Sequence, residues 1–275
     1  MPSLSRETAH RTSAPVTTLF DMDLRALRRD RAARTGPELF LFERAFDDCL
    51  DRLSLVHRQF QHCLLIGCPD PAWRARLGEF VLGIDALDPG GLFASAAGGR
   101  QVAEDSWQEP DAAYDLVIAV GTLDTVNDLP GALRLIRSAM RGDALLLGAM
   151  SGGETLPQLR AAMRAADETT GAASPRIHPR VEAAALAPLL SAAGFANPVV
   201  DVDRARVSYP SLDRLVSDLR GMGATNVLTA RSRSPLLRAG RRAASRAFAA
   251  AGDGERTTET FEILHFAAWT PAKNG

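Results

Sequence analysis

Cysteine, long apolar runs and metal-binding patterns are all scarce in this 275-residue chain. Its three cysteines, Cys49, Cys63 and Cys68, form no Cys-x-x-Cys pair. That pattern argues against a disulfide framework or a structural zinc site and fits a reducing compartment. The five histidines show no His-Glu-x-x-His spacing, so we expect no metal site. No run reaches the ~18 apolar residues that a membrane-spanning helix needs, so we expect no membrane span.

Net charge and lysine are scarce as well. The formal net charge is −1, which excludes a global attraction to nucleic acid or to an anionic membrane. Lys273 is the only lysine among 32 basic residues, and alanine is heavily used. Genomic bias therefore explains the arginines better than anion recognition does, and it favours a bacterial cytoplasm over a mitochondrial matrix. Residues 1–18 faintly resemble a mitochondrial transit peptide, but a disordered bacterial tail is the preferred interpretation.

Strand and helix patterns alternate in the first half of the chain. Short apolar runs bounded by turn residues predict buried strands; they lie at 63–67, 80–84, 114–120 and 144–150. Helices are predicted at 72–77 and 129–140, and the Gly- and Ala-rich residues 88–100 are predicted as a loop. This alternation predicts an α/β fold with a doubly wound, mostly parallel sheet and helices on both of its faces.

The two ends of the chain are expected to be more helical. Residues 19–60 are predicted as a helical cap, in which Phe20, Leu24 and Leu27 face inward and arginines face solvent. Residues 61–275 form the main domain, with helical C-terminal insertions. Its second half is predicted to hold helices at 155–167, 180–193, 211–220 and 234–251, and strands at 199–209 and 258–269. A capping box of Thr155 and Gln158 is expected to begin the first of these helices.

Ligands of a parallel sheet bind beyond the carboxyl ends of its strands. After the first predicted strand, Ile66, Gly67 and Cys68 form a turn whose backbone can approach a cofactor. Asp85, followed by Ala86, ends the second predicted strand, 18 residues after Gly67. A carboxylate about 20 residues beyond such a glycine can accept hydrogen bonds from ribose hydroxyls. A solvated loop acid is an equally good interpretation of this spacing alone.

Two further polar segments follow the third and fourth predicted strands. Glu104 and Asp105 stand where acids can meet an adenine amino group, with a solvated pair as the alternative. Gly121 opens the loop after the strongest strand pattern, and Asp124 in that loop can contact a substrate. We expect residues 127–128 to cap the helix that follows.

Several segments together resemble one family. They are Tyr114-Asp115-Leu116-Val117, Val126-Asn127-Asp128-Leu129-Pro130, Gly148-Ala149-Met150, Ser174-Pro175-Arg176-Ile177, Ala193-Gly194-Phe195 and Gly221-Met222-Gly223. The chain resembles S-adenosylmethionine-dependent class I methyltransferases over roughly residues 19–269. The similar branch holds complex I assembly-factor methyltransferase-like proteins and malonyl-carrier-protein methyltransferases of biotin synthesis. The resemblance implies a seven-stranded sheet with an antiparallel C-terminal edge. It also implies a cofactor held by Gly67, by Asp85 at the ribose, and by Glu104 or Asp105 at the adenine.

The cofactor turn departs from the family pattern. Where the family has Gly-x-Gly-x-Gly, this chain has Gly67-Cys68-Pro69-Asp70-Pro71, and each proline removes an N–H. A lost buried hydrogen bond costs ~1–3 kcal/mol. Two such losses weaken cofactor binding by about two to four orders of magnitude.

These observations give three hypotheses about function. The preferred hypothesis is methyl transfer from S-adenosylmethionine to a small-molecule or protein acceptor, with Asp124, Arg176 and Tyr209 as candidate substrate contacts and no catalytic residue assigned. The second is a non-catalytic assembly factor, of the respiratory complex I type, that binds a protein client and has a degenerate cofactor turn. The third is an arginine-hydroxylase-like activity.

Overall fold

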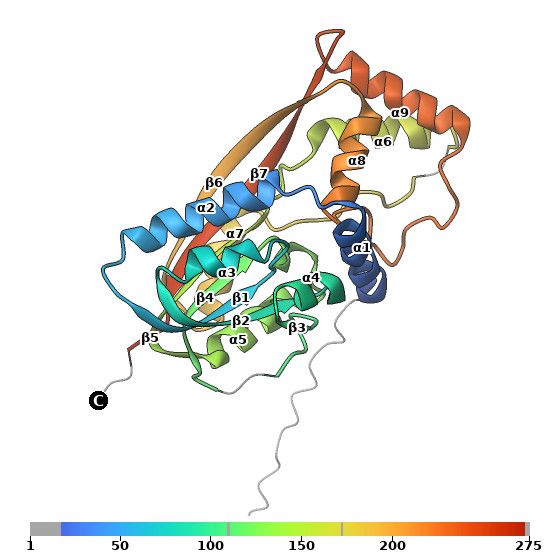
Figure 1. Ribbon diagram of the computed structural model, residues 1–275. Coiled ribbons are helices and arrows are strands. Elements are labelled where there is room, and N and C mark those ends of the chain that lie inside the picture. The colour runs from blue at the N-terminus through green and yellow to red at the C-terminus, as the bar shows by residue number, and fades with distance from the viewer. Residues whose placement is uncertain (1–17, 109–110, 172, 273–275) are drawn as a thin grey trace, which may run out of the picture.

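The computed structural model describes residues 18–108, 111–171 and 173–272, and within them one sheet has the strand order β3-β2-β1-β4-β5-β7-β6 (Figure 1). The first five strands of this order are parallel, and β7 is antiparallel to both β5 and β6. The predicted seven-stranded sheet with an antiparallel C-terminal edge is therefore confirmed. The strands are β1 (Phe60–Ile66), β2 (Val81–Asp88), β3 (Arg100–Gln101), β4 (Tyr114–Val120), β5 (Met140–Ser151), β6 (Ala196–Tyr209) and β7 (Thr257–Trp269).

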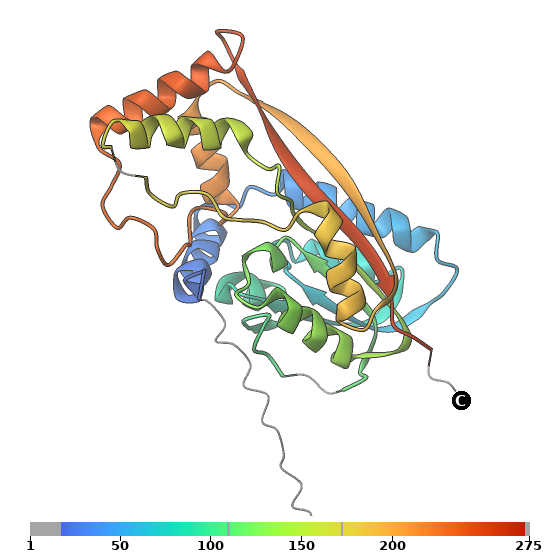
Figure 2. The same cartoon turned by 180° about the vertical axis from the view of Figure 1, so that it is seen from behind.

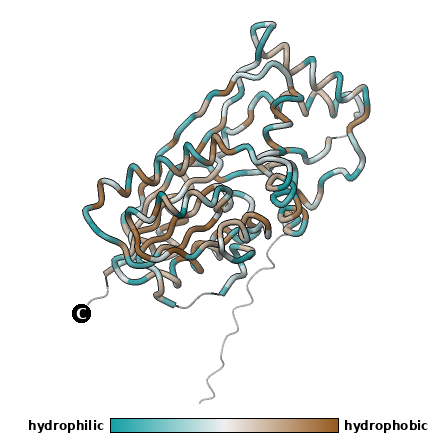
Figure 3. Tube along the Cα trace, viewed as in Figure 1, coloured by the Kyte–Doolittle hydropathy of each residue, from teal (hydrophilic) through white to brown (hydrophobic). Residues whose placement is uncertain are grey.

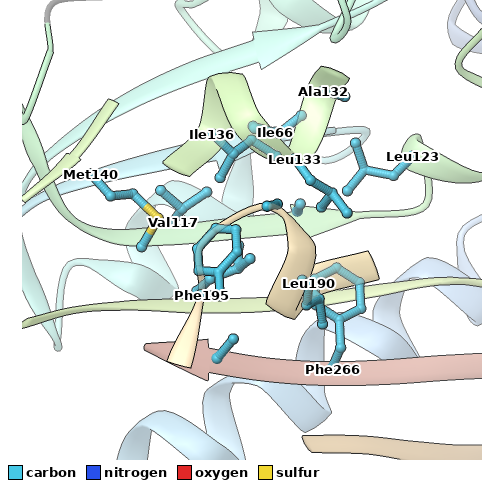
Figure 4. Close-up of a cluster of buried hydrophobic side chains, with 14 of the residues drawn as sticks. Ile66, Val117, Leu123, Ala132, Leu133, Ile136, Met140, Leu190, Phe195 and Phe266 are labelled. Carbon is cyan, nitrogen blue, oxygen red and sulfur yellow. The ribbon is translucent and has the colours of Figure 1, made fainter. Parts of the chain in front are cut away.

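Helices cover both faces of this sheet, because its central strands are apolar on both sides. Every residue of β4 is buried. On one face, α5 (Leu129–Ala139) and α7 (Ala183–Ala192) pack on Val117 and Phe266 (Figures 2 and 4). On the other, α2 (Phe40–Ser54) and α3 (Ala72–Leu77) pack on the alternate residues of the same strands. Figure 3 shows the hydrophobic segments gathered in this central region.

A C-terminal lobe extends from one end of the sheet on a two-stranded ribbon. β7 pairs with β5 only over residues 263–269, and its earlier residues pair with β6 alone. At the far end of this ribbon lie α6 (Pro157–Glu168), α8 (Leu212–Gly221) and α9 (Arg238–Ala250) (Figure 1). The lobe has its own apolar core, which includes Tyr209, Leu215 and Phe248.

Three local predictions from the sequence are wrong. Residues 88–100 are not all loop, because they contain α4 (Gly91–Ala96) and the start of β3. The strand β2 continues three residues past Asp85 to Asp88. The capping box of Thr155 does not form, because Gln158 N donates to the Glu259 carboxylate on β7 at 3.2 Å and α6 begins after Leu156.

The N-terminal helix α1 (Met22–Thr35) begins at Asp21, whose carboxylate accepts from Leu24 N. The predicted inward face is confirmed at Phe20, which is buried, and at Leu24, which packs in the same cluster, but it is wrong at Leu27 and for two of the arginines. Leu27 is 62% exposed, whereas Arg25 and Arg29 are only 3% and 5% exposed. Figure 1 shows α1 beside α4 and α8, at the carboxyl ends of the first strands. No helix in the described residues is long and apolar enough to cross a membrane.

Candidate functional site

The turn after β1 is hydrogen-bonded to the end of β2. Gly67 has a φ of +80°, and a Cβ atom there would lie 2.3 Å from the Val120 carbonyl oxygen. Gly67 N donates to Leu87 O at 2.8 Å, and Cys68 N donates to the Asp88 carboxylate at 3.1 Å. Burial raises the pKa of the Cys68 thiol to about 12, and the Asp88 carboxylate adds to that shift. The first two N–H groups of the turn are therefore engaged within the chain.

The acid at the end of β2 is Asp88, and it forms a buried ion pair. Arg29 Nε and Nη2 donate to its two oxygens at 2.8 and 2.6 Å. Gly90 N donates to it as well, at 2.7 Å. Asp85, the acid expected here, is exposed and accepts from the Tyr114 hydroxyl at 3.0 Å instead. Ala86 is buried beside Leu65, with which it pairs across β1 and β2.

The acid beyond β3 is likewise paired with α1. Arg25 Nη1 and Nη2 donate to the two oxygens of Glu104 at 2.6 and 2.7 Å, and the glutamate is fully buried. Arg25 Nη2 also donates to Thr122 O at 2.6 Å. Asp105 has a different role, because it accepts from the backbone N–H groups of residues 127–128. Asp128 caps α5 through Gly131 N, as predicted.

The N-terminal end of the helix that carries these arginines is anchored at two places. The Phe20 backbone exchanges two hydrogen bonds with the Asn127 side chain, at 2.8 and 3.1 Å. Asp21 N donates to Val227 O at 2.8 Å, and Phe20 packs on Val227 and Leu228. Since α1 is anchored on two separate segments, its arginines are held over the strand ends.

Two adjoining cavities lie near α1. The apolar chamber has a volume of about 620 Å³, counting its open mouth, and is lined mainly by Leu41, Phe42, Ala45, Leu219, Met222, Phe261 and Ile263. The arginine chamber, of about 410 Å³ on the same basis, is lined by Arg25, Arg29, Arg180, Thr125, His178 and Val227, among others. Both are also lined by Gly121, Asp124 and Phe42, so the two cavities adjoin.

Asp124 and Arg180 meet where the two chambers join. Arg180 Nη1 lies 3.3 Å from Asp124 Oδ2, and their side chains are 6% and 11% exposed. Burial raises the pKa of Asp124 and lowers that of Arg180. Asp124 was expected at a substrate site. Arg180 was not, because the sequence around it carries no pattern that marks a buried guanidinium.

The other two predicted substrate residues do not line these chambers. Arg176 pairs with Asp167 at 2.9 Å near the end of α6. Tyr209 is buried in the C-terminal lobe, where burial raises the pKa of its hydroxyl and the Asp218 carboxylate adds to the shift. Gly121 does line both chambers, with a φ of +67° and the Phe42 ring packed over it.

Comparisons with known proteins agree with this fold. The methyltransferase domain family matches residues 38–199. The chain is 30% identical over 270 residues to the zebrafish (Danio rerio) protein named arginine-hydroxylase NDUFAF5, mitochondrial, covering 92% of this chain and 83% of that one. It is 35% identical over 166 residues to malonyl-[acyl-carrier protein] O-methyltransferase of Xylella fastidiosa, covering 58% of this chain and 53% of that one.

Solved structures give the same fold at low sequence identity. YcgJ of Bacillus subtilis matches with a TM-score of 0.56 and 10% identity, over 82% of this chain and 99% of that one. The N-methyltransferase NodS of Bradyrhizobium japonicum, solved with S-adenosylhomocysteine, matches with a TM-score of 0.50 and 12% identity, over 90% and 100%. The chain therefore belongs to the methyltransferase domain family, and it is related to NDUFAF5 and to the malonyl-[acyl-carrier protein] O-methyltransferases.

Proposed function

We propose that this chain is a non-catalytic member of its family, an assembly factor that binds a protein client without using S-adenosylmethionine. One observation carries the proposal. The two acids at the ends of β2 and β3, Asp88 and Glu104, are each held in a bidentate ion pair by an arginine of α1. In this fold the ligand binds beyond these strand ends. In this chain the side chains of Arg25 and Arg29 pair with the acids at that position.

The energies involved oppose cofactor binding. Separating a buried ion pair so that one charge is left without a partner costs about 3–5 kcal/mol, and two such pairs close this site. Micromolar binding of a ligand is worth about 8 kcal/mol in total. Ribose hydroxyls at Asp88 would also compete with Cys68 N and Gly90 N, which already donate to the same carboxylate. The residues present therefore do not fit S-adenosylmethionine in this arrangement.

The turn after β1 supports the same proposal. A cofactor cradled there needs free backbone N–H groups. Gly67 N and Cys68 N are already engaged, and Pro69 and Pro71 have no N–H. The turn and the acid Asp88 thus engage each other, and the two prolines leave the turn with fewer N–H groups for a ligand.

Isothermal titration of the full chain with S-adenosylmethionine and S-adenosylhomocysteine tests the proposal. We expect no binding at about 1 mM ligand, a limit that corresponds to about 4 kcal/mol. Exposed Arg164 offers a matched control, because Arg164→Gln changes the charge of the chain without touching the site. Micromolar binding by the wild-type chain would overturn the proposal.

A second candidate is methyl transfer, because Asp88 and Glu104 are retained at the positions that a nucleoside needs. Under this hypothesis α1 leaves the site before the cofactor enters. The variant Arg25→Ala/Arg29→Ala tests it. Tight cofactor binding by this variant, with weak but measurable binding by the wild type, would favour the second candidate over the first. Arginine hydroxylation, the activity in the name of the mitochondrial relatives, stays a prediction from resemblance.

A further inference from the structure

The arginine chamber has an unusual charge balance. Arg25, Arg29 and Arg180 line it, and each is almost fully buried. The carboxylates that pair with the first two, Glu104 and Asp88, are completely buried and are not among the lining residues. Three arginine side chains therefore line this space, and Asp124 is the only acidic residue among the described lining residues.

A neighbouring histidine responds to the same positive charge. Burial, together with the positive charges of Arg180, Arg28 and Arg25, lowers the pKa of His178 to about 3. Its Nε2 atom accepts a hydrogen bond from Val227 N at 2.9 Å, which a neutral ring can do. The ring thus adds no charge to the chamber, and its surroundings favour a negative ligand.

The guanidinium of Arg180 can donate more hydrogen bonds than it does in the described structure. Its contact with Asp124 is a single one of 3.3 Å. Its Nε is buried, and nothing in the described part of the chain accepts a hydrogen bond from it. Buried N–H groups almost always have an acceptor, so an orphaned one on a buried cation calls for an explanation. Arg180 lines both chambers, so an acceptor for it would lie at their junction.

We propose that the arginine chamber binds the oxyanion of a small aliphatic acid, a carboxylate or a phosphate monoester, whose apolar chain lies in the apolar chamber. Carboxylate and phosphate oxygens match the forked donors of arginine. The side chains of Leu41, Leu219 and Phe261 provide a surface for a short alkyl chain. The inference deepens the proposed function, on which it rests, because α1 must stay in place for Arg25 and Arg29 to line the chamber.

Titration with hexanoate, hexyl phosphate and hexanol tests this inference and distinguishes the two kinds of oxyanion. We expect at least one of the two anions to bind at least tenfold more tightly than hexanol. Arg180→Gln should remove most of that preference, whereas Arg164→Gln on the surface of α6 should leave it unchanged. Equal affinities for the anions and hexanol, or an unaltered preference in Arg180→Gln, would overturn the inference.

A gain of affinity gives a second test that loss of folding cannot imitate. Asp124 competes with the ligand for Arg180, so Asp124→Asn should bind the anions several-fold more tightly than the wild-type chain. Weaker binding by a folded Asp124→Asn variant would contradict the inference. Failure here is distinct from failure of the proposed function, which is decided by titration with S-adenosylmethionine in the absence of these anions.

Discussion

The pair of Arg25 and Glu104 gives the sharpest prediction about stability. Arg25→Met removes the only side chain that donates to Glu104 in the described structure and leaves a fully buried carboxylate without a partner. We expect a loss of about 3–5 kcal/mol in the free energy of unfolding. For a chain of this size, that corresponds to a fall in Tm of roughly 10 °C. Such a loss is a large share of the ~5–15 kcal/mol that stabilises most domains.

The double variant Arg25→Met/Glu104→Leu is the control. It replaces the ion pair with apolar side chains, which is often neutral or stabilising. We therefore expect it to recover most of the stability that Arg25→Met loses. Urea denaturation followed by circular dichroism gives the free energy of each variant, and the four values form a double-mutant cycle. A loss below about 1 kcal/mol in Arg25→Met, the range of exposed pairs, would refute the buried pairing.

Three further predictions follow from local features. Gly67→Ala should lower the free energy of unfolding by at least about 1 kcal/mol, because the added Cβ would clash with Val120 O and the φ of Gly67 is positive. A fall in Tm relative to the wild-type chain checks this. Because burial raises the pKa of Asp124, the folded chain holds a proton that the unfolded chain has lost above its ordinary pKa of 3.8. Stability should therefore fall as pH rises from that value, and urea denaturation should show a smaller fall in Asp124→Asn. Cys68, with a pKa of about 12 and almost no exposure, should react with iodoacetamide at about pH 8 only after unfolding.

The sheet was predictable because its signals are local. The apolar run of β4 is buried at every residue, and the helices around the sheet have amphipathic patterns that a short window detects. The end of β2 was less certain, because the segment 84–88 contains two aspartates and either can end a strand. Only the pairing with β1 and β3 shows that the strand continues to Asp88.

The burial of Arg25 and Arg29 on α1 was not predictable in the same way. The apolar residues of α1 suggested an inward face of Phe20, Leu24 and Leu27, and its arginines suggested a solvated one. The buried partners of Arg25 and Arg29 lie 79 and 59 residues further along the chain. A short stretch of sequence contains the arginine but not its acidic partner. The arginine is therefore assigned to the solvent-exposed face. Arg180, 56 residues from Asp124, escaped notice for the same reason.

The contact between Phe20 and Leu228 has a consequence for the order of folding. These residues form an isolated β-bridge although 208 positions separate them in the chain. Closing so long a loop carries a large entropic cost and makes the contact slow to form. During synthesis Asp88 on β2 and Glu104 beyond β3 emerge long before Leu228 does. A nascent chain therefore has both acids and the Asn127 anchor of α1 before it has the second anchor at Val227 and Leu228, so the fixing of α1 is expected to be completed last.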